Sequence, residues 1–185
     1  MTIKVLAISG SLRKASFNTL ALRAAAELAP EGMEVTLYEG LRDIPLYDDD
    51  LRAGSGYPAP VAAFRAAIKA ADALLIASPE YNFSVSGVLK NAIDWASRAP
   101  DQPFDGKPVA ILGAAAGLTG TARSQYDLRK ILGGLNAMLL NKPEVMIAQA
   151  ATRFDAEGRL TDETARGLLA QQMAALQAWT LRLKG

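Results

Sequence analysis

Five short apolar stretches alternate with helical stretches along this sequence, and this alternation restricts the possible folds more than any other feature. The first stretch, residues 2–9, is too continuously apolar and β-branched for a strand with one wet face, so it predicts a strand covered on both faces. Strands that alternate regularly with helices form a parallel sheet with helices on both faces. Further strands are predicted at residues 33–38, 73–77, 108–113 and 144–148.

The segments between these strands have the spacing of amphipathic helices. In residues 17–28, for example, apolar side chains recur three and four residues apart. Ser84 is expected to cap the helix at residues 85–98. Residues 41–57 contain a proline, consecutive aspartates and two glycines, and we predict a long loop there. Helices are predicted at residues 17–28, 60–71, 85–98, 122–135 and 161–183.

Five parallel strands fit the order 2-1-3-4-5, in which the topological switch point lies between strands one and three. Ligands of such sheets bind outside the carboxyl ends of the strands at that point. The loops at residues 10–18 and 79–84 follow strands one and three, so we expect the ligand there. With 185 residues and no visible linker or repeat, the chain is expected to form a single α/β domain over residues 1–185, a three-layer sandwich.

The chain contains neither cysteine nor histidine, and this restricts the chemistry that it can perform. Without cysteine there is no disulfide, no thiol nucleophile and no thiolate metal ligand. Without histidine, serine–histidine catalysis and histidine-ligated zinc are excluded, and we expect no metal site. Chemistry near neutral pH therefore depends on carboxylates, lysine, tyrosine or a bound cofactor that supplies its own reactivity.

Charge and hydropathy argue against nucleic-acid and membrane partners. The 20 basic residues are scattered among 19 acidic ones, without the basic stripe of a nucleic-acid-binding protein. The first apolar run is too short for a membrane helix or a signal peptide. We therefore expect a cytoplasmic protein that binds neither nucleic acid nor a membrane.

The first loop, residues 10–18, has the composition of a phosphate site. It leads into a helix N-terminus, whose unpaired N–H groups favour an anion. Its single glycine, Gly10, fits neither the dinucleotide fingerprint nor the P-loop, so a terminal monophosphate suits it better than a pyrophosphate. The alternative is an ordinary turn in which Ser16 or Asn18 only caps the helix. The polar side chains in and just after this loop are Ser11, Arg13, Lys14, Ser16, Asn18 and Thr19.

The second loop, residues 78–84, reads Ser-Pro-Glu-Tyr-Asn-Phe-Ser. Pro79 holds the preceding residue extended, so the following side chains project from the carboxyl end of a strand. Aromatic and amide groups beside free backbone N–H groups suit a flat heterocycle. The alternative is that the aromatic residues only pack at the rim and that Asn82 or Ser84 is only a cap.

The third loop, residues 113–121, consists mainly of glycine and alanine. Such small residues allow the backbone to approach a planar ligand closely. The alternative is a flexible connection that ends in a Thr121 cap. The three loops are expected to converge, and together they indicate a ligand more strongly than any one of them.

Three segments occur in the order and spacing of a known family: GSLRKASFN, SPEYNFSVSGVLKNAIDW and GTARSQYDLR. With these motifs the sequence resembles the NAD(P)H-dependent FMN reductase family of flavodoxin-like proteins, over nearly the whole chain. That family includes quinone, chromate and azo-dye reductases. The resemblance implies the flavodoxin-like version of the sandwich described above.

The resemblance also implies FMN, with its phosphate in the first loop and its isoalloxazine ring against the second and third loops. The phosphate-loop pattern falls on Ser11, Arg13, Ser16, Asn18 and Thr19. The ring-side pattern falls on Pro79, Glu80, Tyr81, Asn82 and Ser84, and the third loop contributes Gly113, Ala116 and Gly117.

Two positions depart from the family pattern. Many relatives have proline at position 86, where this chain has Ser86, and its loss is expected to loosen the start of the helix slightly. Relatives often have serine where this chain has Ala115, so a side-chain hydrogen bond near the ring is expected to be missing.

Family members are commonly homodimers or homotetramers with the flavin near a subunit interface, so a homo-oligomer is expected here. The alternative for two of the interface candidates is that Lys90 and Asp94 form only a surface ion pair. For a third, Trp95, the alternative is a place in the core. The candidates are Lys90, Asn91, Asp94, Trp95, Arg123, Tyr126 and Glu144.

The function implied is a two-electron reductase. NADPH or NADH would give a hydride to flavin N5, and small-molecule acceptors would follow: quinones, free flavin, azo dyes or metal oxyanions such as chromate. No protein acid or base is needed, which agrees with the absence of histidine and cysteine. The main alternative is a flavodoxin-type electron carrier, and a net charge of +1 argues against it because such carriers are typically acidic. A regulatory nucleotide-binding domain is a third interpretation.

Overall fold

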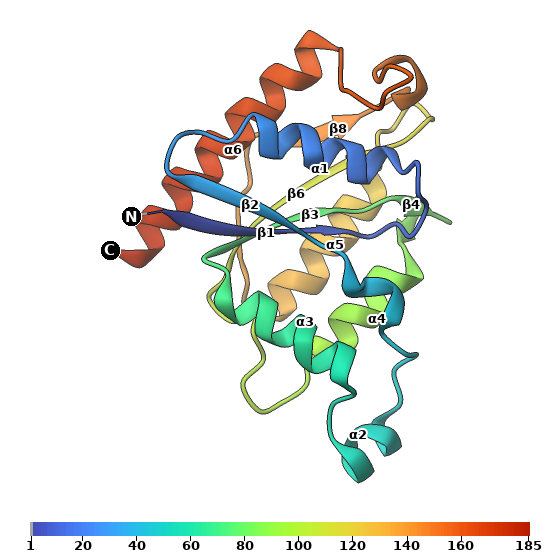
Figure 1. Cartoon of the computed structure of the whole chain (residues 1–185), viewed down its shortest axis with the longest axis vertical. Coiled ribbons are helices and arrows are strands. Elements are labelled where there is room, and N and C mark those ends of the chain that lie inside the picture. Colours follow the sequence, from blue (N-terminus) through green and yellow to red (C-terminus); the bar gives the residue numbers. More distant parts are fainter. Residues whose placement is uncertain (1) are drawn as a thin grey trace.

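The computed structural model describes residues 2–185 and contains the predicted parallel sheet (Figure 1). The four long strands are adjacent in the order β2-β1-β3-β6. The fifth position is shared, because β7 and β8 both pair with β6, one near each of its ends. The predicted order 2-1-3-4-5 is therefore confirmed, with the fifth strand in two pieces. The strands are β1 (Ile3–Ser9), β2 (Met33–Tyr38), β3 (Ala73–Ala77), β6 (Pro108–Ala114), β7 (Met138–Leu139) and β8 (Val145–Ile147).

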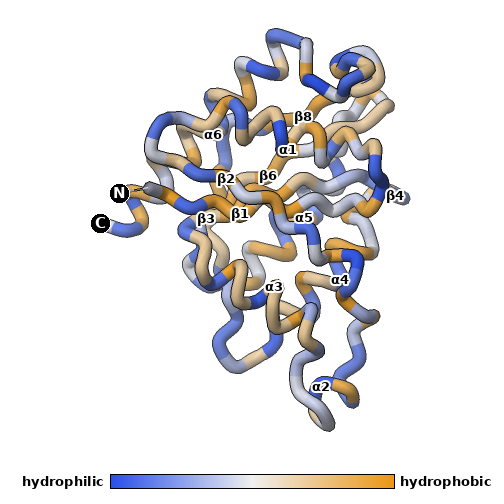
Figure 2. The backbone as a smooth tube through the Cα atoms, viewed as in Figure 1, coloured by the Kyte–Doolittle hydropathy of each residue, from blue (hydrophilic) through white to orange (hydrophobic). Residues whose placement is uncertain are grey.

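Helices cover both faces of this sheet, as predicted. In Figure 1, α1 and α6 lie above the sheet and α3, α4 and α5 lie below it. Hydrophobic residues are concentrated in the strands and recur along the helices beside them (Figure 2). The helices are α1 (Phe17–Glu27), α3 (Ala59–Ala70), α4 (Gly87–Ala96), α5 (Ala122–Gly134) and α6 (Glu163–Lys184), with a short 3-10 turn η2 (Ala150–Thr152) before α6.

The two faces of the sheet form separate hydrophobic cores. On the α1–α6 face, Leu22, Leu169 and Met173 pack against inward-facing strand residues. On the opposite face, Phe64 and Trp95 are among the fully buried side chains. This burial on both faces explains why the strands read as continuous apolar runs. No helix within residues 2–185 is both long enough and apolar enough to cross a membrane.

The prediction of a long loop at residues 41–57 is wrong. The segment contains a 3-10 turn, η1 (Gly40–Asp43), and a short helix, α2 (Asp49–Ser55), which projects from the body in Figure 1. The aspartates explain the helix, because Asp48 Oδ1 accepts hydrogen bonds from the backbone N–H of Asp50 (2.9 Å) and of Leu51 (3.4 Å). A run that resembles a polar loop is in fact an N-cap followed by an acidic first turn.

Candidate functional site

The loops after β1, β3 and β6 meet at the carboxyl edge of the sheet, on the right of Figure 1. Together they enclose a cleft of about 200 Å³, the central cleft. The sequence predicted this convergence. Eight predicted site residues line the cleft, and Phe17, Ala114 and Ala115 line it as well. The eight are Ser11, Arg13, Ser16, Asn18, Pro79, Glu80, Tyr81 and Ala116.

Gly10 lets the first two loops approach each other. A Cβ at Gly10 would lie 3.1 Å from Pro79 Cδ, 3.1 Å from Leu89 Cδ2 and 3.2 Å from the Ala77 carbonyl oxygen. The Gly10 N–H also donates to that carbonyl at 2.8 Å. The one glycine of this loop therefore serves close packing between loops, whereas the side chains after it line the cleft.

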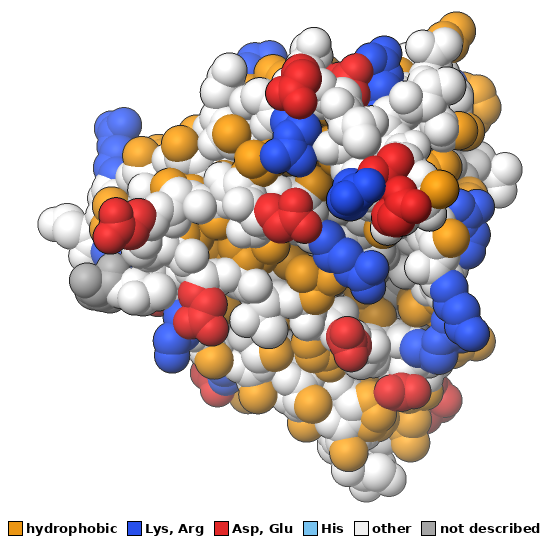
Figure 3. Space-filling model, turned by 45° about the horizontal axis from the view of Figure 1, so that its top comes forward, with side chains coloured by type: hydrophobic (Ala, Val, Ile, Leu, Met, Phe, Trp, Pro, Cys, Tyr) orange, Lys and Arg blue, Asp and Glu red, His pale blue; other side chains and the backbone are white. Residues whose placement is uncertain are grey.

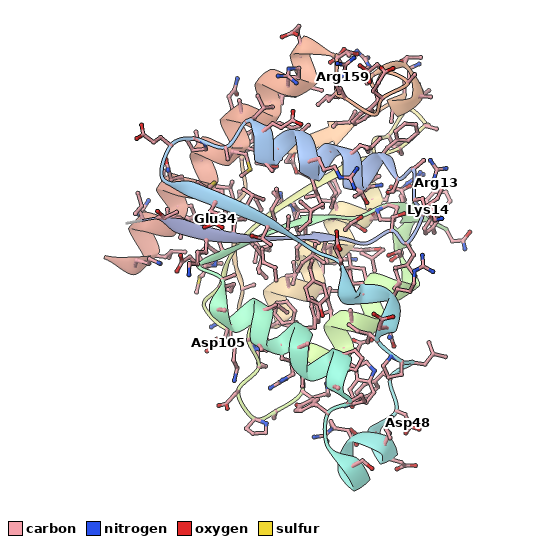
Figure 4. All side chains as sticks on the ribbon, viewed as in Figure 1. Arg13, Lys14, Glu34, Asp48, Asp105 and Arg159 are labelled. Carbon is pink, nitrogen blue, oxygen red and sulfur yellow. The ribbon has the colours of Figure 1, made fainter. Side chains whose placement is uncertain are left out.

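Ser16 and Arg13 shape the first loop in different ways. Ser16 is buried and caps α1, because its Oγ accepts from the Thr19 N–H at 3.4 Å. Arg13 is exposed; its Nη2 donates to the Ala15 carbonyl at 2.6 Å and its guanidinium lies 5.7 Å from the centre of the Phe17 ring. Figure 4 shows Arg13 beside Lys14 at the end of the loop. The capping alternative for Ser16 is therefore correct, and Ser16 also lines the cleft.

Asn18 ties the first loop to the third. Its Oδ1 accepts from the Ala114 N–H at 3.0 Å and its Nδ2 donates to the Ala114 carbonyl at 3.0 Å. The buried amide thus pairs with the backbone of Ala114, the last residue of β6, as the backbone of a neighbouring strand would. This contact shows a positioning role for Asn18, and its assignment to the phosphate stays a prediction.

Thr19 lies on the other side of the first loop. Its hydroxyl is 2.8 Å from the Ser9 hydroxyl, and both residues line a separate pocket rather than the central cleft. The structure therefore places Thr19 beside Ser11 and Arg13, which line both pockets, but not beside Ser16 and Asn18.

The second loop is a two-residue hairpin formed by β4 (Glu80–Tyr81) and β5 (Ser84–Val85). Its turn residues, Asn82 and Phe83, both have left-handed backbone conformations, with φ of +49° and +69°. Such a turn suits the twist of a hairpin, although it is unusual for phenylalanine. The hairpin leaves Tyr81 at the rim of the cleft, 57% exposed, whereas Asn82 is exposed and does not line the cleft.

Ser84 does not cap α4, so that prediction is wrong. Ser84 pairs with Tyr81 in the hairpin, and the Lys130 ammonium, with a smaller contribution from the Ser84 hydroxyl, holds the pKa of Asp127 below its usual value. The cap is Ser86, whose Oγ accepts from the Leu89 N–H at 3.3 Å and donates to the Gly10 carbonyl at 2.6 Å. Serine in place of the family's proline therefore adds a hydrogen bond between the first two loops, and the expected loosening of the helix start stays a prediction.

The Glu80 carboxylate connects the second loop to the start of α5. It accepts from the backbone N–H groups of Arg123 (3.0 Å) and Ser124 (3.3 Å) and forms a salt bridge with the Arg123 guanidinium. Thr121 occupies the N-cap position, as the alternative for the third loop states, but its side chain makes no capping hydrogen bond. A carboxylate at this position satisfies free N–H groups and suits the helix dipole.

Removing this long-range cap should destabilise the protein. For Glu80→Ala we expect the free energy of unfolding to fall by about 1–2 kcal/mol, the usual effect of losing a helix cap. Glu80→Gln, which keeps an acceptor for the N–H groups, should lose less. Urea unfolding of both variants measures the difference, with Glu157→Ala as a surface control. Equal loss in both Glu80 variants would show that the ion pair, rather than the cap, stabilises this junction.

Gly113 and Gly117 in the third loop do not line the cleft. Gly113 lies within β6, where an added Cβ would be 1.7 Å from Thr121 Oγ1. Gly117 accepts a hydrogen bond from the Gln149 N–H at 3.0 Å. Beside the cleft, the Ala115 N–H donates to the Ile147 carbonyl and the Ala115 carbonyl accepts from the Ala150 N–H. Backbone hydrogen bonds thus connect the loop to the segment at residues 147–150.

Among the interface candidates, Lys90 and Asp94 form the predicted ion pair at 2.8 Å. Trp95 is fully buried, and its Nε1 donates to the Pro45 carbonyl at 2.9 Å. The ion pair is confirmed and Trp95 lies in the core, while an interface role for Lys90 and Asp94 stays a prediction. The expected homo-oligomer stays a prediction.

The residues of the central cleft fit FMN. The Ser11 hydroxyl, the Arg13 guanidinium and the free N–H groups of the first turn of α1 provide donors for a phosphate. The wall opposite consists of the small residues Ala114–Ala116, which leave room for a flat group against the backbone. The cleft therefore has one end with donors for the FMN phosphate and another end with space for the isoalloxazine ring.

Comparison with known proteins decides the family. Residues 3–152 match the family described as NADPH-dependent FMN reductase. The chain belongs to this family. It is an oxidoreductase that uses FMN and NAD(P)H, and the family resemblance seen in its motifs is confirmed.

Individual FMN reductase relatives agree over nearly the full length. An NAD(P)H-dependent FMN reductase of Pseudomonas aeruginosa is 59% identical over 183 residues, covering 99% of this chain and 98% of that protein. A quinone reductase of Escherichia coli is 45% identical, covering 98% and 97%. The structure of the flavoenzyme NAD(P)H:acceptor oxidoreductase FerB of Paracoccus denitrificans matches with a TM-score of 0.87, 35% identity and 98% coverage of both chains. The flavodoxin-like fold is confirmed.

Sequence reasoning missed two residues of this FMN reductase site, Phe17 and Ala114, as cleft-lining residues, whereas Ala115, expected near the ring, does line the cleft. The sequence predicts Phe17 only as the first residue of a helix; in the structure its ring centre lies 5.5 Å from that of Phe154, and the residue lines the cleft. The sequence predicts that the fourth strand ends at residue 113, one residue too early, and therefore assigns Ala114 to the loop. A signal was present, because Phe17 and Ala114 each adjoin a residue that the motifs singled out.

Proposed function

We propose that this FMN reductase transfers two electrons from NAD(P)H to quinones, with FMN held in the central cleft. The observation that carries the proposal is the convergence of the three loops on one open cleft, with phosphate donors at one end and Tyr81 exposed at the rim. The relatives named quinone reductase and NADPH:quinone oxidoreductase support the acceptor class. We extend the proposal to free flavin, azo dyes and chromate as further acceptors.

When bound, FMN would supply the redox chemistry, a two-electron transfer from NAD(P)H to the acceptor. The chain positions it. Ser11, Arg13 and the N-terminus of α1 bind the phosphate, and the clamp from Asn18 fixes the distance between that end and the ring wall. No side chain lining the cleft, within residues 2–185, is required as an acid or base. The small wall and open rim leave space for acceptors of different shapes.

Purified protein tests this proposal directly. We expect a flavin absorption spectrum that NADPH bleaches under anaerobic conditions, and NADPH oxidation that accelerates strongly when benzoquinone is added. Bleaching without turnover in the presence of quinone would support the electron carrier instead. A colourless protein that does not bind added FMN would contradict both functions.

Arg13→Ala tests the phosphate end. Charge-assisted hydrogen bonds contribute about 1.5–3 kcal/mol, so we expect the dissociation constant for FMN to rise roughly 10- to 100-fold. The neighbouring Lys14→Ala variant is the matched control and should retain FMN as the unaltered protein does. Fluorescence titration of apoprotein with FMN measures both. If Arg13→Ala binds FMN with unaltered affinity, the phosphate lies elsewhere.

A further inference from the structure

One side chain at the start of α5, Arg123, contacts the second loop at two residues that flank Tyr81. Its guanidinium forms a salt bridge with the carboxylate of Glu80, the residue directly before Tyr81. The same guanidinium lies over the ring of Phe83, with 3.9 Å between Arg123 Cζ and the ring centre. Arg123 therefore contacts the hairpin of β4 and β5 on both sides of its exposed tyrosine.

The contact with Glu80 involves a carboxylate that several donors hold in place. The Glu80 side chain is only 8% exposed, and its carboxylate also accepts from the backbone N–H groups of Arg123 and Ser124. Successive side chains of a strand point to opposite faces, so the direction of Glu80 in β4 determines the direction of Tyr81. A fixed carboxylate at position 80 thus restricts the Tyr81 side chain, which lies at the rim of the central cleft.

The contact with Phe83 supports an unusual backbone conformation. Phe83 has a φ of +69°, a left-handed conformation that bulky side chains rarely adopt. Such conformations persist where the surrounding structure holds them in place. The Phe83 ring is mostly exposed, and the guanidinium over its face provides a stacking and cation–π contact that stabilises the turn in this form.

The hairpin that Arg123 contacts forms one side of the entrance to the central cleft. In Figure 1, β4 lies at the carboxyl edge of the sheet, on the right. Tyr81 lines the cleft and is more than half exposed, whereas Arg123 does not line the cleft. An effect of Arg123 on a molecule in the cleft therefore has to pass through the hairpin and the ring of Tyr81.

We propose that Arg123 is a positioning residue of the reductase. By holding Glu80 and Phe83, it keeps Tyr81 at the entrance of the cleft, where the tyrosine ring contacts flat acceptors. The inference rests on the function proposed above. Figure 3 shows acidic and basic side chains interspersed over one face of the molecule, without a broad field of one sign there, and this favours a role of Arg123 through local contacts.

Steady-state kinetics of the FMN-loaded enzyme test the role of Arg123. For Arg123→Ala we expect KM for benzoquinone to rise about five- to tenfold, as for the loss of an aromatic contact, while kcat stays within about twofold. Arg123→Lys keeps the charge but not the planar group, so its KM should rise nearly as much. The matched control is Arg182→Ala, which removes an arginine that lies over the Trp179 ring at the distant end of α6 and should leave KM unchanged. An unaltered KM in Arg123→Ala, or full recovery by lysine, would overturn the proposal.

A double variant tests whether Arg123 acts through Tyr81. If it does, Tyr81→Ala should raise KM for benzoquinone at least as much as Arg123→Ala does. The double variant Arg123→Ala/Tyr81→Ala should then raise KM no further than Tyr81→Ala alone, because the ring that Arg123 positions is already absent. Independent effects that multiply in the double variant would contradict the positioning role.

Limited proteolysis of the full chain gives a readout that does not depend on activity. Chymotrypsin can cleave after Tyr81 and Phe83 when the hairpin opens, so mass spectrometry should show cleavage there about five times faster or more in Arg123→Ala. Cleavage after the buried Phe64 reports global unfolding and should stay unchanged, as should all cleavage in Arg182→Ala. Equal cleavage of the hairpin with and without Arg123 would overturn the proposal. Absence of benzoquinone reduction by the unaltered protein would instead contradict the proposed function, and the cleavage rates would still show whether Arg123 holds the hairpin.

Discussion

Replacement of Gly113 by alanine is expected to lower the free energy of unfolding by about 3 kcal/mol or more, near the upper end for overpacked cores. The added Cβ would lie 1.7 Å from Thr121 Oγ1, 2.9 Å from Thr121 Cβ and 3.0 Å from the Ser78 carbonyl oxygen. Both β6 and the Thr121 side chain are buried, so no exposed end can move aside. Urea unfolding monitored by circular dichroism measures the loss.

Moving Thr121 away from the added Cβ would itself cost stability. It has a left-handed backbone, with φ of +71°, which is strained for a β-branched residue, and its Oγ1 accepts from Gln125 Nε2 at 3.1 Å. A displaced Thr121 would shift both the start of α5 and the third loop beside the cleft. We therefore expect Gly113→Ala to weaken FMN binding as well as the fold.

A second substitution tests whether the loss of stability comes from this collision or from a general sensitivity of β6 to substitution. Thr121→Gly removes the colliding atoms and suits a positive φ. The double variant Gly113→Ala/Thr121→Gly should recover most of the stability lost by Gly113→Ala alone, giving a coupling energy of about 1–3 kcal/mol. Strictly additive effects of the two substitutions would contradict the contact that we describe.

The sequence predicts those features that depend on local pattern. The apolar runs of β1, β3 and β6 reflect burial on both faces, and the helices between the strands are visible as periodic apolar spacing. Because this regular alternation is typical of a parallel sheet, the order of the strands could be predicted. The loop compositions predicted which three segments would meet, because parallel strands bring their carboxyl ends to one edge. The aspartates before and within α2 misled the prediction, since the same residues favour both loops and helix N-termini.

The roles of individual side chains could not be predicted, because they depend on partners far away in the sequence. Asn18 bonds to a backbone 96 residues later, and Glu80 caps a helix whose first N–H groups are 43 and 44 residues later. Local rules assign both residues to a turn, a cap or a ligand. Only the folded sheet brings their true partners within hydrogen-bond distance.

Asn18→Asp is expected to have the second large effect, and this effect should depend on pH. The Ala114 carbonyl accepts from the Asn18 amide at 3.0 Å in a site where Asn18 is only 4% exposed. An introduced carboxylate would face that oxygen without a donor, and burial of an uncompensated charge is strongly unfavourable. At pH 8 we expect a loss of about 3–5 kcal/mol in stability, and FMN affinity should fall through repulsion of the phosphate.

The pH dependence follows from the protonation of the introduced group. Burial beside a carbonyl raises its pKa in the folded state above the unfolded value of about 3.9, so the folded state binds more protons and the deficit grows as pH rises through this range. A protonated carboxyl donates to the Ala114 carbonyl and accepts from its N–H, as the amide does. Asn18→Leu, which has a similar shape and no charge, should instead lose about the same stability at pH 5 and pH 8. Thermal unfolding of the apoproteins measures stability separately from FMN retention. If Asn18→Asp loses the same stability at pH 5 and at pH 8, Asn18 does not hold β6 through the two hydrogen bonds to Ala114.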